Sequence, residues 1–387
     1  MIDPNIISLV KFISANIKSI DDKKSKWAKL KSENVGLFAE LLGIENEGIK
    51  NPGSLIDFDI DEESQLILLN YSGQAHNTLH QYSCGWSSTL RQIRGLVFDV
   101  SNPANPVLVS RSFEKFFNLG ELAENTYENL LLKYGENNKF VATEKIDGHM
   151  IQYFMHNDKL YSTTRGRFKT ISGLEAQSYF TAEAFNEVNS FMGNRIMTFA
   201  VELVTKSTEV FVDYEGNESI YLLSAYDVDG NKLSYSDLNV IYDSFPQYFK
   251  KPNRKMFTLV EALKEKNDRS VLNSEGWVID LNGELIKLKY ISYIGMMVKS
   301  KLSFKYLMSC MINDRLEKMI NTLPEETRTI SDEMLKVLIQ KRKESLEQND
   351  HKVLYSLYND YDFNEGSESY FRTICRKYFK SLKKESC

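Results

Sequence analysis

Between residues 64 and 290 the chain is a succession of short apolar or alternating runs separated by turn-forming residues, and this pattern constrains the fold most. Runs of this length that are rich in β-branched and aromatic residues predict strands. The 21 Tyr and 22 Phe also favour sheets, and Asn282-Gly283 predicts a tight hairpin between the last two runs. The predicted strands are SQLILLNY (64–71), RGLVFDV (94–100), PVLVSR (106–111), KFVATEK (139–145), KLYSTTR (159–165), IMTFAVELV (196–204), SIYLLSAYDV (219–228), GWVIDL (276–281) and ELIKLKY (284–290).

Helical patterns flank and interrupt these strands. Residues 1–50 place their apolar side chains near one helical face, and 173–192 and 258–266 are also predicted helices. After Ser300 the pattern is helical throughout. There Ser331 is predicted to cap a helix that continues through the apolar residues Met334, Leu335, Leu338 and Ile339 to Lys341-Arg342-Lys343. Residues 367–384 are a further predicted helix, and Pro324 and residues 359–366 are predicted breaks.

These patterns predict an α+β fold with two domains. Residues 1–295 would form a β-rich domain with a helical N-terminal segment, and residues 296–387 would form an all-α domain.

Bulk properties exclude several classes of protein. No apolar run is long enough to cross a bilayer and the N-terminus lacks the features of a secretory signal, so we expect a cytoplasmic protein. The scattered cysteines, Cys84, Cys310, Cys375 and Cys387, indicate neither a zinc site nor a disulfide framework. The net charge of −5 is unusual for a nucleic-acid enzyme, so any basic surface has to be local.

The first candidate for chemistry is Glu144-Lys145-Ile146-Asp147-Gly148, where a predicted strand enters an Asp-Gly turn and a second predicted strand, HMIQYF (149–154), follows. A lysine at a strand end that faces a pocket can act as a nucleophile when its amine is neutral. Nearby positive charge or desolvation would lower its pKa. The alternative is a surface lysine at a hairpin, and Lys-x-Asp-Gly alone occurs by chance in roughly one chain in ten of this length.

Three further features follow in order along the chain. Glu202 and the Glu275 of Glu275-Gly276-Trp277-Val278 lie at predicted strand positions and could hold Mg²⁺, which prefers oxygen ligands. Lys287 and Lys289 point to the same face of one strand. They could bind an α-phosphate and lower the pKa of Lys145, although alternating lysines are also ordinary on exposed strands.

The ordered set Lys-x-Asp-Gly, Glu, Glu-Gly-hydrophobe-Val and Lys-x-Lys resembles the covalent nucleotidyltransferase superfamily of ligases and capping enzymes. Upstream, Arg94-Gly95-Leu96-Val97-Phe98 and Ser110-Arg111-Ser112-Phe113-Glu114-Lys115-Phe116-Phe117-Asn118-Leu119 look like the T-even phage RNA ligase family that repairs cleaved tRNA. Thr163-Thr164-Arg165-Gly166 and residues 201–214 share this likeness. The resemblance covers roughly residues 60–295.

This resemblance implies an antiparallel-sheet adenylyltransferase domain and a role for each matched residue. Lys145 would be the adenylated nucleophile, with Asp147 and Gly148 completing its motif and Glu144 beside it. Arg94, Lys115 and Arg165 would bind the β- and γ-phosphates, and Lys287 and Lys289 the α-phosphate. Glu202 and Glu275 would bind nucleotide and metal, and Tyr71 would lie near the nucleotide.

The implied reaction joins 5′-phosphate and 3′-hydroxyl RNA ends, using ATP with Mg²⁺ (or Mn²⁺), through Lys–AMP and RNA–adenylate intermediates. Nicked tRNA or single-stranded RNA ends would be the partners of a monomeric enzyme without membrane contact, located in the host cytoplasm if the gene is phage-encoded. The helical second domain would select the RNA.

Rival interpretations are a DNA ligase or a capping guanylyltransferase, which place an OB-fold after the Lys-x-Lys motif, and an inactive RNA-binding module.

Two further features of the sequence have more than one interpretation. His149 could be a base but is better explained as a strand residue. The basic tail with Arg372, Arg376, Lys377, Lys380, Lys383 and Lys384, interleaved with Tyr378 and Phe379, could contact RNA or could be a solvated amphipathic helix.

Overall fold

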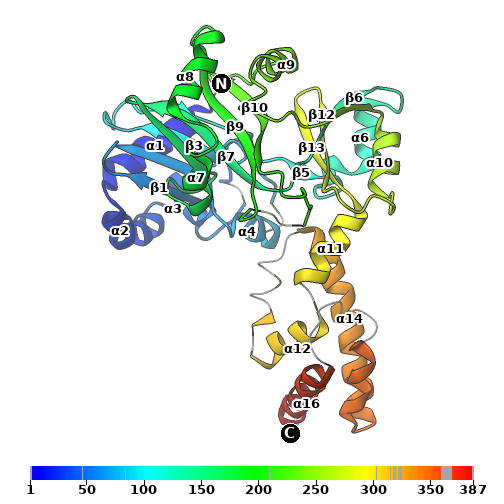
Figure 1. Cartoon of the computed structure of the whole chain (residues 1–387). Helices are drawn as coiled ribbons and strands as arrows, with labels where there is room; N and C mark the ends of the chain where they lie inside the picture. The colour runs from blue at the N-terminus through cyan, green and yellow to red at the C-terminus, as the bar shows by residue number, and fades with distance from the viewer. Residues whose placement is uncertain are drawn as a thin grey trace.

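The protein is described here from a computed structural model. The structure describes residues 2–45, 47–82, 84–208, 211–301, 303–313, 315–316, 320, 325–358 and 368–385. Three sheets form the body of the molecule, and helices beyond residue 290 extend from it as an arm (Figure 1). None of the described helices is long and apolar enough to span a membrane.

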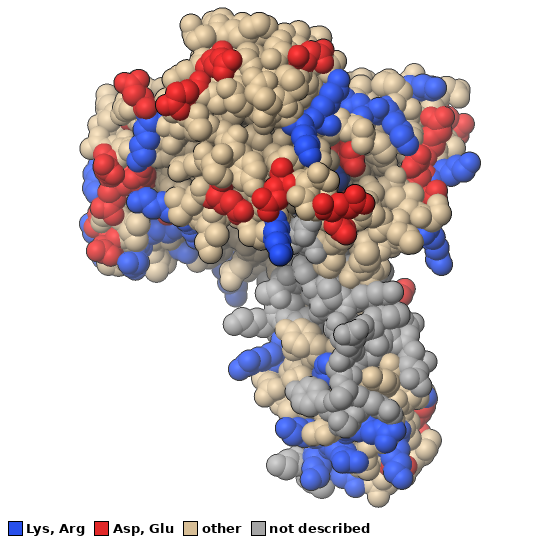
Figure 2. Space-filling view, in the orientation of Figure 1, with Lys and Arg blue, Asp and Glu red and all other residues tan. Residues whose placement is uncertain are grey.

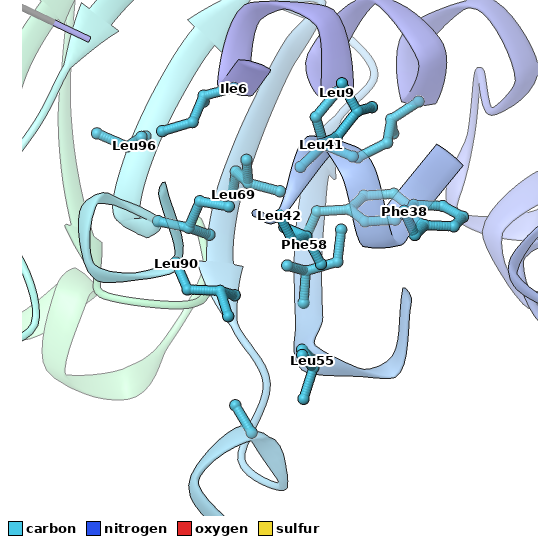
Figure 3. Packing of buried hydrophobic residues seen from close by; sticks show 14 of the residues in the cluster. Ile6, Leu9, Phe38, Leu41, Leu42, Leu55, Phe58, Leu69, Leu90 and Leu96 are labelled. Carbon is cyan, nitrogen blue, oxygen red and sulfur yellow. The ribbon is translucent and has the colours of Figure 1, made fainter. Parts of the chain in front are cut away.

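The first sheet lies between helices and the second sheet. Its strands, in the order β1-β2-β3-β4, are antiparallel. Ile67 and Leu69 of β2 pack with Ile6 and Leu9 of the N-terminal helices, whereas Leu66 and Leu68 face the second sheet (Figure 3). Because both faces of β2 are covered, its sequence is apolar almost throughout rather than alternating. The elements are α1 (Pro4–Asn16), α2 (Ile20–Glu33), α3 (Val35–Leu41), η1 (Pro52–Leu55), β1 (Ile56–Asp61), β2 (Leu66–Tyr71), α4 (Ala75–Gln81), α5 (Ser88–Gln92), β3 (Arg94–Asp99) and β4 (Val107–Ser110).

The second sheet, in the order β10-β9-β7-β8, is antiparallel as well. One face contributes Phe154 and Tyr161 to the contact with the first sheet, and the other is covered by α7, α8 and α9. Helix α9 begins with a capping box formed by Ser234 and Asp237. The elements are β7 (His149–His156), β8 (Lys159–Thr164), α7 (Ile171–Ala176), α8 (Ala182–Phe191), β9 (Ile196–Val204), β10 (Ser219–Asp227) and α9 (Tyr235–Ser244).

The third sheet has the order β11-β6-β12-β13-β5, and its one parallel pair is β13 with β5. Asn282 and Gly283 join β12 to β13 with φ values of 57° and 102°, as a primed two-residue hairpin turn requires. Residues 145–148 connect β6 of this sheet directly to β7 of the second sheet, so the lysine motif lies where the two sheets meet. The elements are β5 (Phe117–Asn118), η2 (Ala123–Asn125), α6 (Tyr127–Tyr134), β6 (Phe140–Glu144), β11 (Arg254–Phe257), α10 (Leu259–Lys266), β12 (Gly276–Leu281) and β13 (Glu284–Lys289).

The described residues after Lys289 form helices and no strand. They are α11 (Ile291–Lys301), α12 (Phe304–Ile312), α14 (Glu325–Glu347), η3 (His351–Ser356) and α16 (Glu368–Glu385). Phe304, Leu338, Leu354 and Phe371 belong to an apolar core that is separate from those of the sheets.

All the predicted strands are present, most of them within one or two residues of the predicted bounds. The strand predicted after the Asp147-Gly148 turn is β7, whereas β1, β5 and β11 were not predicted, and the predicted helix 173–192 is two helices, α7 and α8. The prediction that Ser331 caps a helix is wrong. Helix α14 begins earlier, at Glu325, and Ser331 is buried inside it. The predicted breaks at Pro324 and residues 359–366 lie outside the described residues.

The first testable consequence concerns Gly276, which follows Glu275 and is the first residue of β12. Its φ of +144° is unfavourable for other residues, and an added Cβ would lie 2.0 Å from the Leu288 carbonyl oxygen. Gly276→Ala should therefore lower the free energy of unfolding by about 3 kcal/mol, measured by urea denaturation.

Gly36→Ala is the matched control, because no atom lies within 4 Å of a Cβ at that position in α3. It should be neutral or stabilising by up to about 1 kcal/mol. Equal stability of the two variants would contradict the steric argument.

Candidate active site

Lys145 is held at the junction of the second and third sheets by its backbone. Its N–H donates to the Gly276 carbonyl oxygen at 2.9 Å, which ties the end of β6 to the start of β12. The turn that follows Lys145 leaves no room for a side chain at Gly148, because a Cβ there would lie 2.4 Å from the Leu203 carbonyl oxygen. Gly148 therefore permits β7 to approach β9 closely, directly beside Lys145.

Asp147 holds the turn after Lys145 in place through hydrogen bonds. One carboxylate oxygen accepts hydrogen bonds from the backbone N–H groups of Phe211 and Val212 at 2.9 and 3.1 Å, and the other accepts from the Tyr293 hydroxyl at 2.9 Å. Its own N–H donates to the Tyr214 hydroxyl at 2.7 Å. Asp147 is 4% exposed and thus positions Lys145 rather than lining the cavity.

Glu275 joins two of the predicted lysines. One of its carboxylate oxygens lies 2.6 Å from Lys145 Nζ and the other 3.2 Å from Lys289 Nζ. Glu275 is 3% exposed, and a carboxylate this buried needs such partners.

The pKa of Lys145 is raised in this arrangement. Burial alone would lower it, but the carboxylates of Glu275, Glu202 and Asp147 together favour the ammonium form. The prediction that Lys287 and Lys289 lower the pKa of Lys145 is therefore wrong, since the net shift is upward. The reason is that Lys289 is itself neutralised by the carboxylate that pairs with Lys145.

Lys287 is the lysine with a depressed pKa. Burial, aided by the positive charges of Lys115, Lys145 and Arg94, lowers the pKa of Lys287 to about 7. Its Nζ lies 4.8 Å from the centre of the Phe116 ring. Because no carboxylate in the described part of the chain forms an ion pair with Lys287, this lysine is available to an anionic ligand.

Glu202 lies on β9, opposite Met150 of β7. Burial, reinforced by the negative charges of Glu275 and Asp147, raises the pKa of Glu202 to about 8, although Lys145 and Arg94 oppose the shift. Burial therefore disfavours the charged form of Glu202, and a bound cation would favour it.

Lys145, Glu202, Lys287 and Lys289 line one cavity of about 230 Å³ together with apolar groups, whereas the buried Asp147 and Glu275 do not line it. Its size is below the usual range for nucleotide-sized ligands, but it adjoins a groove of about 620 Å³ that shares Phe113 and Phe116 with it. Of the predicted residues, the cavity is lined by Arg94, Glu144, Lys145, Glu202, Lys287 and Lys289.

The other predicted phosphate-binding residues lie farther out. Lys115 lines the adjoining groove, 3.5 Å from a Glu121 carboxylate oxygen and 4.5 Å from the centre of the Phe117 ring. Arg165 is exposed and packs on Tyr71, with its guanidinium carbon 4.7 Å from the centre of the ring. Neither Tyr71 nor Arg165 lines the cavity around Lys145.

Glu202 and Glu275, the two candidate metal ligands, could hold a divalent cation only together with other oxygen donors. Within the described part of the chain, no three His, Cys, Asp or Glu side chains form a group that could hold a metal. Mg²⁺ is commonly held by one or two carboxylates together with substrate phosphates. Glu202 and Glu275 match that donor set, provided that nucleotide phosphates complete it.

Sequence reasoning missed several residues at the site. Phe113 lies in a quoted motif but had no predicted role, and Met150 and Tyr235 line the cavity without any motif to mark them. Lys232, which also lines it, pairs with Asp280 at 3.3 Å. Their side chains meet only through the tertiary fold. His149 is exposed and its ring contacts Ser172 at 2.6 Å, so nothing in its surroundings indicates catalysis.

Comparison with known proteins gives relatives of one kind. A sequence model of the family described as RNA ligase matches residues 92–310. A protein of Autographa californica nuclear polyhedrosis virus, named "Putative bifunctional polynucleotide kinase/RNA ligase", is 26% identical over 271 residues, or 65% of this chain and 36% of that protein. A "Putative RNA ligase" of Thermovibrio ammonificans is 25% identical over 223 residues, or 57% of this chain and 53% of that protein.

The chain thus matches about a third to a half of the length of these relatives. Among solved structures, an archaeal ATP-dependent RNA ligase aligns with a TM-score of 0.45 and 12% identity, covering 85% of this chain and 73% of that one. A variant of Naegleria gruberi RNA ligase with ATP and Mn aligns with a TM-score of 0.35 and 19% identity, covering 43% and 55%.

Because the family model matches more than half of the residues, the chain belongs to the T4-type RNA ligase family. The matched segment contains the strands that carry Lys145, Glu202, Glu275, Lys287 and Lys289.

The pKa of Lys287 leads to a second prediction. A phosphate binds the charged form of the lysine, whose charge is lost as the pH rises through about 7. Affinity for α,β-methylene ATP, which cannot release pyrophosphate, should therefore fall about tenfold between pH 7 and pH 8.5. Lys287→Arg retains its charge and should show a flatter profile, measured by calorimetry. Identical pH profiles would rule out Lys287 as the titrating group.

Proposed function

We propose that the protein is an ATP-dependent RNA ligase that works through a covalent Lys145–AMP intermediate. The observation that carries this proposal is the cavity itself. It places one anchored lysine among Arg94, Lys287 and Lys289, so a triphosphate would meet a nucleophile and several cations in one place.

In the first step, the neutral amine of Lys145 attacks the α-phosphorus of ATP. A P–N bond forms, and the bond to the pyrophosphate oxygen breaks with release of pyrophosphate. Lys287 and Lys289 neutralise the oxygens of the transferring phosphorus, and Arg94 and Lys115 hold the leaving pyrophosphate. A Mg²⁺ or Mn²⁺ ion held by Glu202, Glu275 and nucleotide phosphates would supply positive charge that lowers the pKa of Lys145 and stabilises the leaving group.

Lys145 must lose its proton before it attacks. In the ligand-free protein the carboxylate of Glu275, 2.6 Å away, favours the ammonium form. Engagement of Glu275 by a cation would remove that stabilisation. The lysine would then become nucleophilic only when the nucleotide and its counter-ion are both in place, which protects the free amine from other electrophiles.

In the second step, the 5′-phosphate of an RNA end attacks the phosphorus of Lys145–AMP and takes AMP, giving A(5′)pp(5′)RNA and freeing Lys145. In the third step, a 3′-hydroxyl attacks the RNA 5′-phosphorus, forming the phosphodiester and releasing AMP. The same cations would serve all three steps, because each displaces a group from a phosphorus whose oxygens are negatively charged.

We further propose that residues 296–387 form an all-α domain of a monomeric enzyme that selects the RNA, with broken tRNA as the physiological substrate. Support comes from α16, whose exposed face carries Arg372, Arg376, Lys377, Lys380 and Lys383. Figure 2 shows basic side chains gathered at the far end of these helices. Tyr378 and Phe379 are buried in the helical core, so this face would bind phosphates without stacking on bases.

The third prediction tests the nucleophile. Incubation with α-labelled ATP and divalent cation, without RNA, should leave label on the denatured protein, and Lys145→Ala should abolish it. Lys139→Ala, on a lysine just before β6, is the matched control and should be labelled normally.

A label from GTP instead of ATP would turn the assignment to RNA capping. Absence of any label, from folded protein shown by mass not to be already adenylated, would leave a binding module as the better explanation. Sealing of 5′-phosphate and 3′-hydroxyl RNA ends then separates an RNA ligase from a DNA ligase.

A further inference from the structure

A second basic surface lies beside the site, in a segment that no motif marks. Residues 250–255, with the sequence KKPNRK, contain Lys250, Lys251, Arg254 and Lys255 and lead into β11. Four cations in six residues stand out in a chain whose net charge is −5. Figure 2 shows basic side chains gathered on the face between α9 and β6, where this segment runs.

The segment forms one wall of a groove of about 480 Å³. The groove is lined by Val141, Tyr235, Asn239, Lys251, Pro252, Asn253, Arg254, Lys255 and Met256. Met256 is 52% exposed although it is apolar, and Tyr235 is partly exposed. The groove therefore combines cations with uncovered apolar surface, as a site for single-stranded nucleic acid does.

The groove adjoins the cavity around Lys145. Tyr235 lines both. Asn253 donates to the Glu144 carboxylate at 2.7 Å from its side chain and 3.2 Å from its backbone, and Glu144 precedes Lys145 and lines the cavity. A chain lying in the groove would thus have one end at the reacting phosphorus.

The cations are held in place without being neutralised. Arg254 is packed against Tyr235 and Tyr242, with its guanidinium carbon 4.6 and 5.4 Å from the ring centres, and donates to Asn239 and to the Tyr242 hydroxyl. Among the described residues, Lys250, Lys251 and Arg254 form no ion pair. Lys255 pairs only with a partly exposed Glu265 at 3.6 Å, an interaction of small energy.

We propose that this groove binds the backbone of single-stranded RNA next to the end that reacts at Lys145. Phosphates would contact Lys251, Arg254 and Lys255, and a base would lie on Met256 or Tyr235. RNA is favoured over an acidic protein because the groove opens at the cavity where an RNA end has to arrive. The inference rests on the proposed function, and its test separates the two.

The test, our fourth prediction, compares Lys251→Ala/Lys255→Ala with the wild type. Neither lysine lines the cavity around Lys145, so labelling by ATP should persist and also report correct folding. The dissociation constant for a 5′-phosphorylated single-stranded RNA, measured by fluorescence anisotropy, should rise about tenfold. The slope of log affinity against log salt should fall by about 1.4, because two phosphate contacts are lost.

Two further variants sharpen the comparison. Lys251→Arg/Lys255→Arg keeps both charges and should bind RNA like the wild type. Lys24→Ala/Lys29→Ala removes two exposed charges from α2 and should also bind normally. Sealing of pre-adenylated RNA should weaken only in Lys251→Ala/Lys255→Ala.

The outcomes are distinct. Unchanged RNA affinity and salt slope in Lys251→Ala/Lys255→Ala, with normal labelling by ATP, would overturn the groove proposal and leave the ligase intact. An equal loss of affinity in Lys24→Ala/Lys29→Ala would overturn it too, since the effect would then be one of total charge. Failure of the wild type to form an adduct would instead count against the proposed function.

Discussion

The carboxylate of Glu275, shared by Lys145 and Lys289, is the interaction on which the site depends. A buried carboxylate is stable only with full partners, and here both of its oxygens pair with lysines. This fixes the relative positions of β6, β12 and β13, since each residue comes from a different one of those strands or from its end. The ion pairs that balance the charge of Glu275 therefore also hold these three strands in their relative positions.

The packing of the strands around the site also affects the protonation of its ionisable groups. The β6–β12 pairing and the close approach of β7 to β9 bring Lys145, Glu202 and Lys287 together in one buried site. Three ionisable groups in such a space cannot all keep their ordinary protonation states. Lys287 tends to lose its proton and Glu202 to keep one, so the resting site avoids an excess of unpaired charge.

Sequence patterns predicted the strands because their side chains alternate or are continuously apolar, and the Asn282-Gly283 turn because positive φ values restrict residue choice. The motif residues that line the cavity were predicted by resemblance. The pKa of Lys145 was not, because it depends on which carboxylates lie near it in three dimensions. Tyr71 and Arg165 pair with each other and lie beside Arg94 without lining the cavity, which the linear order of motifs could not show.

Tyr293 connects the lysine turn to the helical arm. Its hydroxyl bonds the Asp147 carboxylate, and it lies in the first turn of α11, the helix from which the arm extends (Figure 1). A tilt of α11 that broke this bond would leave a buried carboxylate oxygen short of a donor, at a cost of about 1–3 kcal/mol. The orientation of the arm and the geometry of the lysine turn are therefore energetically coupled through this hydrogen bond. A ligand that stabilises one orientation of the arm would stabilise the matching geometry of the turn by the same free energy, and the reverse also holds.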